Sequence, residues 1–217
     1  MKWRIFFMSA LFLLVFSTCT KFGKNVYVDG YVRNAITGEP VPNVSLTIYR
    51  GQIDWKDPLG IDSKTLKTTT TDANGYYKLE YLSTLFNQVH IRIGGGVEGG
   101  YIVVQGGDGI IKKGKKNHKD YGIVPYGQLH WHIKNTNCEG ITDTMWYKIK
   151  YQYNSDYLNL WSFPYIGCTD ISGNGTDKVE MGNHIIYMKI SRPSGIIYKY
   201  DTVFVNESGI TNFDLFY

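Results

Sequence analysis

The sequence has little charge, little proline and few cysteines. Charged residues are 19% of the 217 residues, with 6 Pro and 3 Cys. Disordered chains are rich in charge and poor in aromatic residues, whereas aromatic residues here reach 15%. Coiled coils need long heptads rich in Ala, Glu, Lys and Leu, which this composition does not offer. We therefore expect a folded chain with one large hydrophobic core or two smaller ones.

A strong excess of positive charge is also missing. The chain has 23 Lys and Arg against 19 Asp and Glu, which gives a formal net charge of +4. Domains that bind nucleic acids normally concentrate many more basic residues on one face. We therefore expect no nucleic-acid partner.

Motifs of common enzymes are absent from the sequence as well. It contains neither the GxSxG motif of hydrolases nor the HExxH motif of metalloproteases. The glycine-rich segment 94–100 lacks the Lys-Ser/Thr pair and the following helix of a phosphate-binding loop. We therefore expect a non-enzymatic protein with no cofactor.

The N-terminus has the pattern of a secretory signal. Lys2 and Arg4 precede an apolar stretch over residues 5–16, which is followed by small residues. About twelve apolar residues are too few for a membrane-spanning helix, which needs ~20. The pattern predicts a signal peptide over residues 1–18.

The segment Phe16-Ser17-Thr18-Cys19 resembles the lipobox of bacterial lipoproteins, in which the cysteine is lipidated and becomes the new N-terminus. The commonest lipobox residues at positions 16 and 18 are different, so cleavage by a general signal peptidase remains an alternative. The resemblance implies lipidation of Cys19, a short tether over residues 19–25 and attachment to a membrane. It predicts an outer-membrane lipoprotein of the cell envelope, with the leaflet left open.

Two further cysteines, Cys138 and Cys168, lie in the body of the chain. In an oxidising compartment such a pair favours a disulfide. A catalytic or metal-bound thiolate would need a CxxC spacing or a nearby histidine, and neither is present. We therefore predict a Cys138–Cys168 disulfide.

Alternation of apolar and polar residues predicts strands through most of the chain. Val26, Val28 and Val32 alternate with polar residues, and so do Leu129, Trp131 and Ile133. A break is expected after residue 105, where residues 106–109 lead to the polar stretch 112–119, which is not expected to pack in a core. The fold class predicted is therefore all-β, with β-sandwich domains at residues 26–124 and 125–217. Asn74-Gly75 is expected to form the tight turn of a hairpin.

The first half also resembles the carboxypeptidase regulatory-like domains. The resemblance lies in GYVRNAITGEPVPNVSL at residues 30–46 and in TTTDANGYYKL at residues 69–79. It implies a transthyretin-like β-sandwich over the first domain and no active site. For the second domain, strand spacing and the cysteine pair suggest an immunoglobulin-like sandwich.

Aromatic residues of the second half are the candidate ligand-binding residues. Trp146 alternates with Met145 and Tyr147, so one of the two strand faces must present aromatic rings to solvent. A second group of aromatic residues lies within the expected disulfide loop, where binding residues are often found; its members are Tyr157, Trp161 and Tyr165.

The functional hypothesis is a binding or scaffolding module for another envelope component, either a protein or a glycan. The alternative is a glycan-binding accessory protein that uses the aromatic residues at 157–165.

His130 and His132 lie two residues apart, so both rings are expected on one strand face. With His118 or His184 they would be weak candidates for metal ligands. No carboxylate or cysteine at ligand spacing completes the set. The polar face of a strand explains the pair without a metal, and we predict no metal site.

Overall fold

A computed structural model describes residues 24–51, 63–83, 88–94, 100–107, 109–153 and 160–217. Within these ranges the chain forms strands and no helix, which confirms the predicted all-β class. None of the described segments is therefore a helix that would span a membrane. The signal peptide and Cys19 lie outside the described residues.

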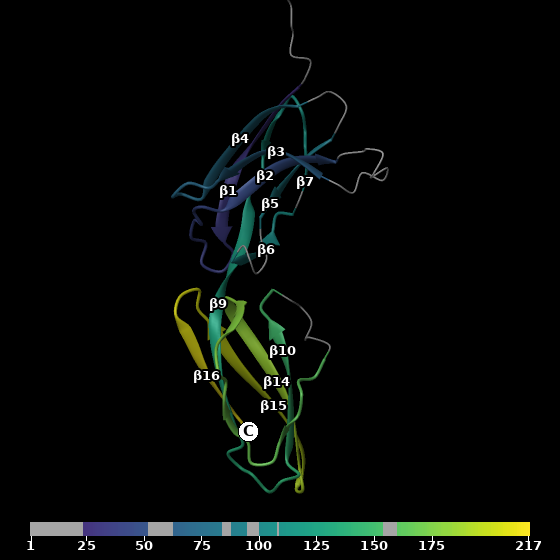
Figure 1. Cartoon of the computed structure of the whole chain (residues 1–217), viewed down its shortest axis with the longest axis vertical. Coiled ribbons are helices and arrows are strands. Elements are labelled where there is room, and N and C mark those ends of the chain that lie inside the picture. The colour runs from purple at the N-terminus through teal and green to yellow at the C-terminus, as the bar shows by residue number, and fades with distance from the viewer. Residues whose placement is uncertain (1–23, 52–62, 84–87, 95–99, 108, 154–159) are drawn as a thin grey trace, which may run out of the picture.

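The first eight strands form the N-terminal lobe, which is the upper part of Figure 1. They are β1 (Lys24–Asn34), β2 (Ser45–Gly51), β3 (Ser63–Thr70), β4 (Tyr76–Ser83), β5 (Val89–Ile93), β6 (Tyr101–Gln105), β7 (Gly109–Ile111) and β8 (Lys116–His118). β1 pairs with β4 and β8, while β3, β2, β5 and β7 form a second sheet in that order. Val26, Val28 and Val32 are buried in the core of this lobe, as their alternation predicts.

The stretch 106–119 is more ordered than the sequence predicts. Ile111, at the end of β7, is buried in the core, and β8 pairs in parallel with β1. The Asn117 side chain donates hydrogen bonds to the backbone carbonyls of Tyr27 and Lys112. Residues 112–119 stay outside the core, as the sequence predicts. The strands β7 and β8 were not predicted, because three-residue strands are too short to show a period of two.

The turn at residues 72–75 forms as predicted but does not close a hairpin. Asp72 Oδ1 accepts hydrogen bonds from the backbone N–H groups of Asn74 and Tyr76, and Gly75 has φ of 70°. However, β3 pairs with β2 while β4 pairs with β1, so the turn carries the chain between two sheets. The Thr71 hydroxyl, which donates to Val41 O, helps to hold the end of β3 beside the β2 sheet.

The C-terminal lobe is built from two facing sheets. Its strands are β9 (Tyr121–Lys134), which also enters the other lobe, β10 (Thr144–Tyr151), β11 (Tyr165–Ile166), β12 (Asp170–Ser172), β13 (Asp177–Glu180), β14 (Gly182–Arg192), β15 (Gly195–Val205) and β16 (Ile210–Phe216). One sheet has the order β11-β10-β14-β15, and in the other β9 pairs with β12, β13 and β16. Between them lies a core that includes Leu129, Ile133, Ile186 and Leu215.

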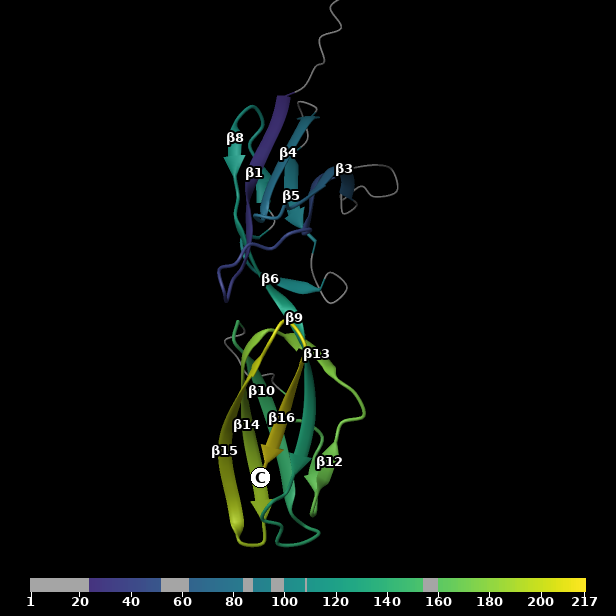
Figure 2. The same ribbon diagram turned by 90° about the vertical axis from the view of Figure 1, so that its left-hand side faces the viewer.

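β9 is common to both lobes and runs from one into the other (Figures 1 and 2). Its first residues pair with β1 and β6, and its later residues pair with β13, β12 and β16. Ile123 belongs to the first core and Leu129 to the second. The expected domain boundary between residues 124 and 125 falls inside this strand, and the division into two domains remains a prediction.

Loop contacts also join the lobes. The Tyr153 hydroxyl donates a hydrogen bond of 2.9 Å to Ala35 O. The Asn34 amide lies 3.5 Å from the sulfur of Met181. A shared strand and contacts on its flanks hold the two lobes end to end.

Candidate functional site

The outward face of the β10–β14–β15 sheet carries an unusual set of side chains. Met145 and Ile186 point into the core, so their neighbours on each strand point outward. The register brings Trp146, Lys189 and Tyr198 into one row across the three strands. Lys148, Tyr187 and Tyr200 form the next row. We call these six residues, together with Trp161 from the loop after β10, the aromatic–lysine face.

Tyr187 is the centre of this face. Its ring stacks on Tyr200 with centroids 4.7 Å apart and on Tyr198 with centroids 5.8 Å apart. On the other side, the ring of Trp161 lies 5.6 Å away. Tyr187 is half-buried by these neighbours, whereas Tyr198 and Tyr200 are 55% and 66% exposed. The most accessible rings therefore lie on β15.

Lysines cover the tryptophan rings of the face. Lys148 Nζ lies 4.6 Å from the centroid of the Trp161 ring, and Lys189 Nζ lies 5.5 Å from that of Trp146. Lys150 adds a third positive charge two residues after Lys148 on the same side of β10. The residues that alternate onto this side of the three strands include no Asp or Glu. The face is therefore aromatic and positively charged.

β15 forms one border of this sheet. Among the described residues it pairs over its full length with β14 and with no second strand. Figure 2 shows it at the outer side of the lower lobe. The most exposed tyrosines of the face thus stand beside a backbone edge whose outward N–H and C=O groups have no strand partner among the described residues.

The candidate residues from the sequence are distributed over two sides of the lobe. Trp146 and Trp161 belong to the aromatic–lysine face. Tyr165 instead stacks on Tyr147, with ring centroids 6.1 Å apart, and packs against the core. Tyr157 lies outside the described residues. Phe163, between Trp161 and Tyr165, is largely exposed.

Sequence reasoning missed the three tyrosines of the face. Tyr198 and Tyr200 alternate with Lys199 and Asp201, a pattern that predicts a strand with rings on one side. That pattern does not reveal Tyr187 as their partner, because the contact depends on the register of the β14–β15 hairpin. The signal was present in the spacing of Tyr198 and Tyr200, but it identifies only the edge strand.

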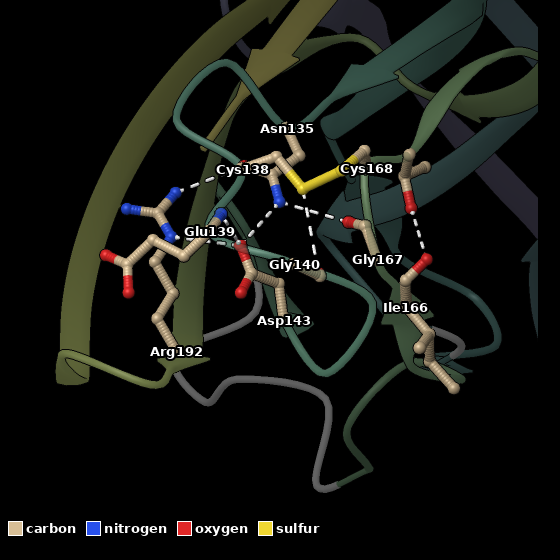
Figure 3. The surroundings of a disulfide bond; sticks show 10 residues. Asn135, Cys138, Glu139, Gly140, Asp143, Ile166, Gly167, Cys168 and Arg192 are labelled. Carbon is tan, nitrogen blue, oxygen red and sulfur yellow. Dashed lines mark hydrogen bonds and ion pairs between the residues drawn. A yellow bond between two sulfur atoms is a disulfide. The ribbon is translucent and has the colours of Figure 1, made fainter.

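Cys138 and Cys168 form a disulfide, as the sequence predicts (Figure 3). The bridge lies beside a buried polar cluster. The Asn135 amide donates 3.0 Å hydrogen bonds to Asp143 Oδ2 and to Gly167 O, and Arg192 Nε lies 3.6 Å from Asp143 Oδ2. The pKa of Asp143 lies below its ordinary range. The main cause is the hydrogen bond from the backbone N–H of Glu139, followed by the hydrogen bond from Asn135 and the charge of Arg192. This cluster fixes the loops on either side of the bridge.

The histidines are engaged with other protein groups. His132 Nε2 lies 2.8 Å from Asp170 Oδ1, and its Nδ1 lies 3.0 Å from Asp214 Oδ1. Hydrogen bonds to Asp170 and then to Asp214 raise the pKa of His132. His130 Nδ1 lies 3.0 Å from the carbonyl oxygen of Gly175. Within the described ranges, no group of three or more His, Cys, Asp or Glu side chains is arranged to hold a metal ion.

The remaining histidines are not gathered around His130 and His132. His118 lies on β8 of the N-terminal lobe, between Asp29 and Asp120, at an open surface hollow. His184 is buried, and its Nε2 lies 2.6 Å from Glu180 O. The structure therefore does not bring together the four histidines that the sequence offered as weak metal ligands.

Comparison with known proteins gives no family assignment. No family model and no curated protein matches the chain. Among solved structures, the chain is similar to the Bacillus anthracis TIE protein, with 13% identity and a TM-score of 0.37 over 89% of this chain. The chain spans about a third of that protein's length, since the match covers 34% of it.

Two pilins are also similar to the chain. The shaft pilin SpaA from Lactobacillus rhamnosus GG has 10% identity and a TM-score of 0.31, covering 89% of this chain and 97% of SpaA. The minor pilin GBS52 from Streptococcus agalactiae has 8% identity and a TM-score of 0.35, covering 88% of this chain and 94% of GBS52.

Proposed function

We propose that the chain is a non-enzymatic binding module of the cell envelope that contacts another envelope component through the aromatic–lysine face. The observation that carries this proposal is the exposure of Tyr198 and Tyr200 on a sheet face that also presents Lys148 and Lys189. Exposed contiguous aromatic surface on a folded protein commonly marks an interaction site. Aromatic rings with basic side chains are also typical of interface centres.

The proposal includes a lipid anchor at Cys19, which would make the chain an outer-membrane lipoprotein. The described chain begins at Lys24, the first residue of β1. That end of β1 lies at the opposite end of the molecule from the C-terminal lobe (Figure 1). An anchor at Cys19 would therefore hold the aromatic–lysine face away from the membrane surface, where a partner has access to it.

The resemblance of the first half to carboxypeptidase regulatory-like domains fits this function. We assign residues 26–124 to such a transthyretin-like domain and residues 125–217 to an immunoglobulin-like domain. Support comes from the separate hydrophobic cores, each lying between two sheets. In this assignment the first domain is the spacer and the second carries the binding surface.

Glycan binding is the second candidate function. It is favoured by the two exposed tyrosine rings beside Lys189, because sugar rings stack on aromatic rings and sugar hydroxyls accept hydrogen bonds from lysine side chains. Binding of a polysaccharide to this face would change the emission of Trp146 and Trp161. A titration with envelope polysaccharide that leaves Trp emission unchanged would contradict this candidate.

The main proposal is tested by photo-crosslinking in native membranes. A photoreactive residue replaces Tyr198, and the matched control replaces Ile110, which is 54% exposed on β7 of the other lobe. We expect a discrete crosslinked product from position 198 and none of the same mass from position 110. Equal products from both positions, or none from either, would refute the proposed function.

The anchor is tested by the intact mass of detergent-extracted protein. Lipidation predicts a lipid-sized mass increase that is lost in Cys19→Ala. An unlipidated mass in the wild-type protein would refute the anchor while leaving the binding face untouched.

A further inference from the structure

We propose that β15 receives an extended, acidic peptide segment of a partner protein as an additional strand beside the aromatic–lysine face. This inference rests on the proposed binding function and names the chemistry of the partner. Three features of the described residues carry it: the orientation of the β15 backbone, the lack of protection along its edge, and the charge of the face.

The register of the β14–β15 hairpin determines which backbone groups are free. Pro193 and Ser194 form a two-residue connection closed by Arg192 and Gly195. In such hairpins the closing pair is hydrogen-bonded, and hydrogen-bonded and non-hydrogen-bonded pairs then alternate. Tyr198 and Tyr200 therefore fall at non-hydrogen-bonded positions, and their N–H and C=O groups point away from β14.

An independent contact supports this orientation. The backbone N–H of Thr202 donates a 2.7 Å hydrogen bond to Asp201 Oδ1 and is therefore not directed to β14. Thr202 has the same parity as Tyr198 and Tyr200 along the strand. Each of these tyrosines consequently presents its ring to the outward face and its backbone to the open edge.

The edge is also poorly protected against a further strand. Natural sheets usually protect their edges with prolines, bulges or several charges. The eleven residues of β15 contain no proline, and their pairing with β14 shows no register shift. Its two charged residues, Lys199 and Asp201, alternate to the side of the sheet opposite Tyr198 and Tyr200. These two charges give partial protection, whereas Ile196 and the two tyrosines are exposed and leave that part of the edge open to a partner strand.

An added strand would make specific side-chain contacts. Alternate side chains of the incoming segment would lie opposite Tyr198 and Tyr200, in the cross-strand positions where aromatic and β-branched residues interact favourably. Backbone hydrogen bonds would supply affinity, and these alternate positions would supply selectivity.

The positive charge of the aromatic–lysine face favours acidic residues in the added segment. Lys189 lies on β14, one strand from the edge, so an added strand would be about 10 Å away at the usual strand spacing. This distance is about one Debye length at physiological ionic strength, before the reach of a lysine side chain is counted. Lys148 and Lys150 lie behind it, and the outward residues of β10, β14 and β15 include no carboxylate, so acidic residues in the segment are favoured.

Ring orientation favours a peptide over a glycan as the occupant. Lys148 covers the Trp161 ring and Lys189 covers the Trp146 ring. Tyr187 is stacked against both edge tyrosines. A sugar needs an open ring face, and because the central rings already have neighbours, only the two edge tyrosines, Tyr198 and Tyr200, remain for stacking. An added strand contacts the same two rings and also pairs with the backbone of β15.

The test is a selection from a phage-displayed library of random peptides, using the full chain in detergent. We expect enriched peptides with alternating acidic and β-branched or aromatic residues. Synthetic copies should bind at least about tenfold less tightly when their acidic residues are replaced by lysine. N-methylation of alternate backbone amides should weaken binding by a similar factor, because it blocks strand pairing.

A protein variant tests the same edge without altering the rings. Thr202→Pro removes an N–H that is not bonded to β14 and places a proline ring at the open edge. Thr202→Val keeps the N–H and is the matched control. We expect the affinity for the peptide to fall at least tenfold in Thr202→Pro and to persist in Thr202→Val. A tenfold change in affinity corresponds to about 1.4 kcal/mol of binding free energy. If Thr202→Pro does not fold, the N-methylated peptides still test strand pairing, because their binding is measured with the wild-type protein.

Each other outcome refutes the inference. Enrichment of basic peptides excludes an acidic added strand. So does peptide binding by Thr202→Pro that equals that of the wild type together with binding of N-methylated peptides that equals that of the unmodified peptides. Binding of polygalacturonate with no peptide enrichment supports the glycan candidate instead. Concentration-dependent dimerisation that Thr202→Pro abolishes identifies a second copy as the occupant. In each of these cases a crosslink from position 198 to a different protein or glycan in membranes still supports the proposed function, whereas the absence of such a crosslink refutes both proposals.

Discussion

The rings of Tyr187 and Tyr200 stack with their centroids 4.7 Å apart and their planes at 29°, across a pair of residues that are direct partners in the β14–β15 register. The two rings have different surroundings. Tyr187 also contacts Tyr198 and Trp161, whereas Tyr200 stands at the edge strand and is mostly exposed. One ring therefore supports the sheet, and the other is available for contact.

Replacing these two tyrosines by alanine should separate stability from binding. Tyr187→Ala removes three ring contacts from a half-buried position and should lower the free energy of unfolding by about 2 kcal/mol. Tyr200→Ala should cost less than about 1 kcal/mol, because the ring is mostly in solvent. Urea unfolding of both variants provides the comparison. Equal losses would contradict the central position assigned to Tyr187.

Reduction of the Cys138–Cys168 disulfide should destabilise the C-terminal lobe. The bridge joins residues 30 apart in the sequence. A loop of this size should contribute roughly 3–4 kcal/mol through the entropy of the unfolded chain. Urea unfolding with and without reductant measures the difference, and the double variant Cys138→Ser/Cys168→Ser should not respond to reductant. A wild-type protein that is indifferent to reductant would contradict the prediction.

Arg192 should be far more sensitive to substitution than a lysine on the outward face. Its side chain is 6% exposed and lies beside the fully buried carboxylate of Asp143. Arg192→Met leaves that carboxylate without its cation, which is strongly destabilising for a buried pair. Lys150→Met is the matched control on the solvent side of the same sheet. Unfolding free energies at neutral pH should fall markedly for Arg192→Met only, and similar values for both would contradict this account.

The sequence predicted the strands better than it predicted their assembly. Val26, Val28 and Val32 are buried as expected because a period of two reports directly on which side of a strand faces the core. The Asn74-Gly75 turn was also recognisable, yet it joins two sheets. Turn residues specify local backbone geometry, whereas the pairing of β3 with β2 depends on distant contacts such as Thr71 with Val41.

The candidate site was predictable only in part for the same reason. The phase of Trp146 indicated an aromatic face on β10, but nothing local placed Tyr187 and Tyr198 beside it. Trp161 lies in the loop after β10 and Tyr165, four residues later, begins β11, yet their rings lie on opposite sides of the sheet. Their separation follows from the path of the chain from β10 to β11, which composition and spacing do not encode.

The pH dependence of stability should reveal the ion pairs of His132. Hydrogen bonds that the His132 ring donates to Asp170 and then to Asp214 raise the pKa of His132 above its ordinary value of about 6.5. A raised histidine pKa gives a stabilising contribution that is complete below about pH 6.5 and is lost as pH rises through the folded-state pKa. Lys134 and then His132 lower the pKa of Asp170, so the carboxylate's contribution is lost only at strongly acidic pH.

The measurement is the difference in unfolding free energy between wild type and His132→Gln at about pH 5 and about pH 8. The difference must be used because His184 acts in the opposite direction: burial lowers its pKa, and its contribution falls as pH drops below about 6.5. We expect His132→Gln to be more destabilising at the acidic pH than at the alkaline one. His130→Gln, which removes a contact to a backbone carbonyl and no ion pair, should show no such dependence. A His132→Gln effect that is the same at both pH values would mean that the ion pairs to Asp170 and Asp214 do not stabilise the fold.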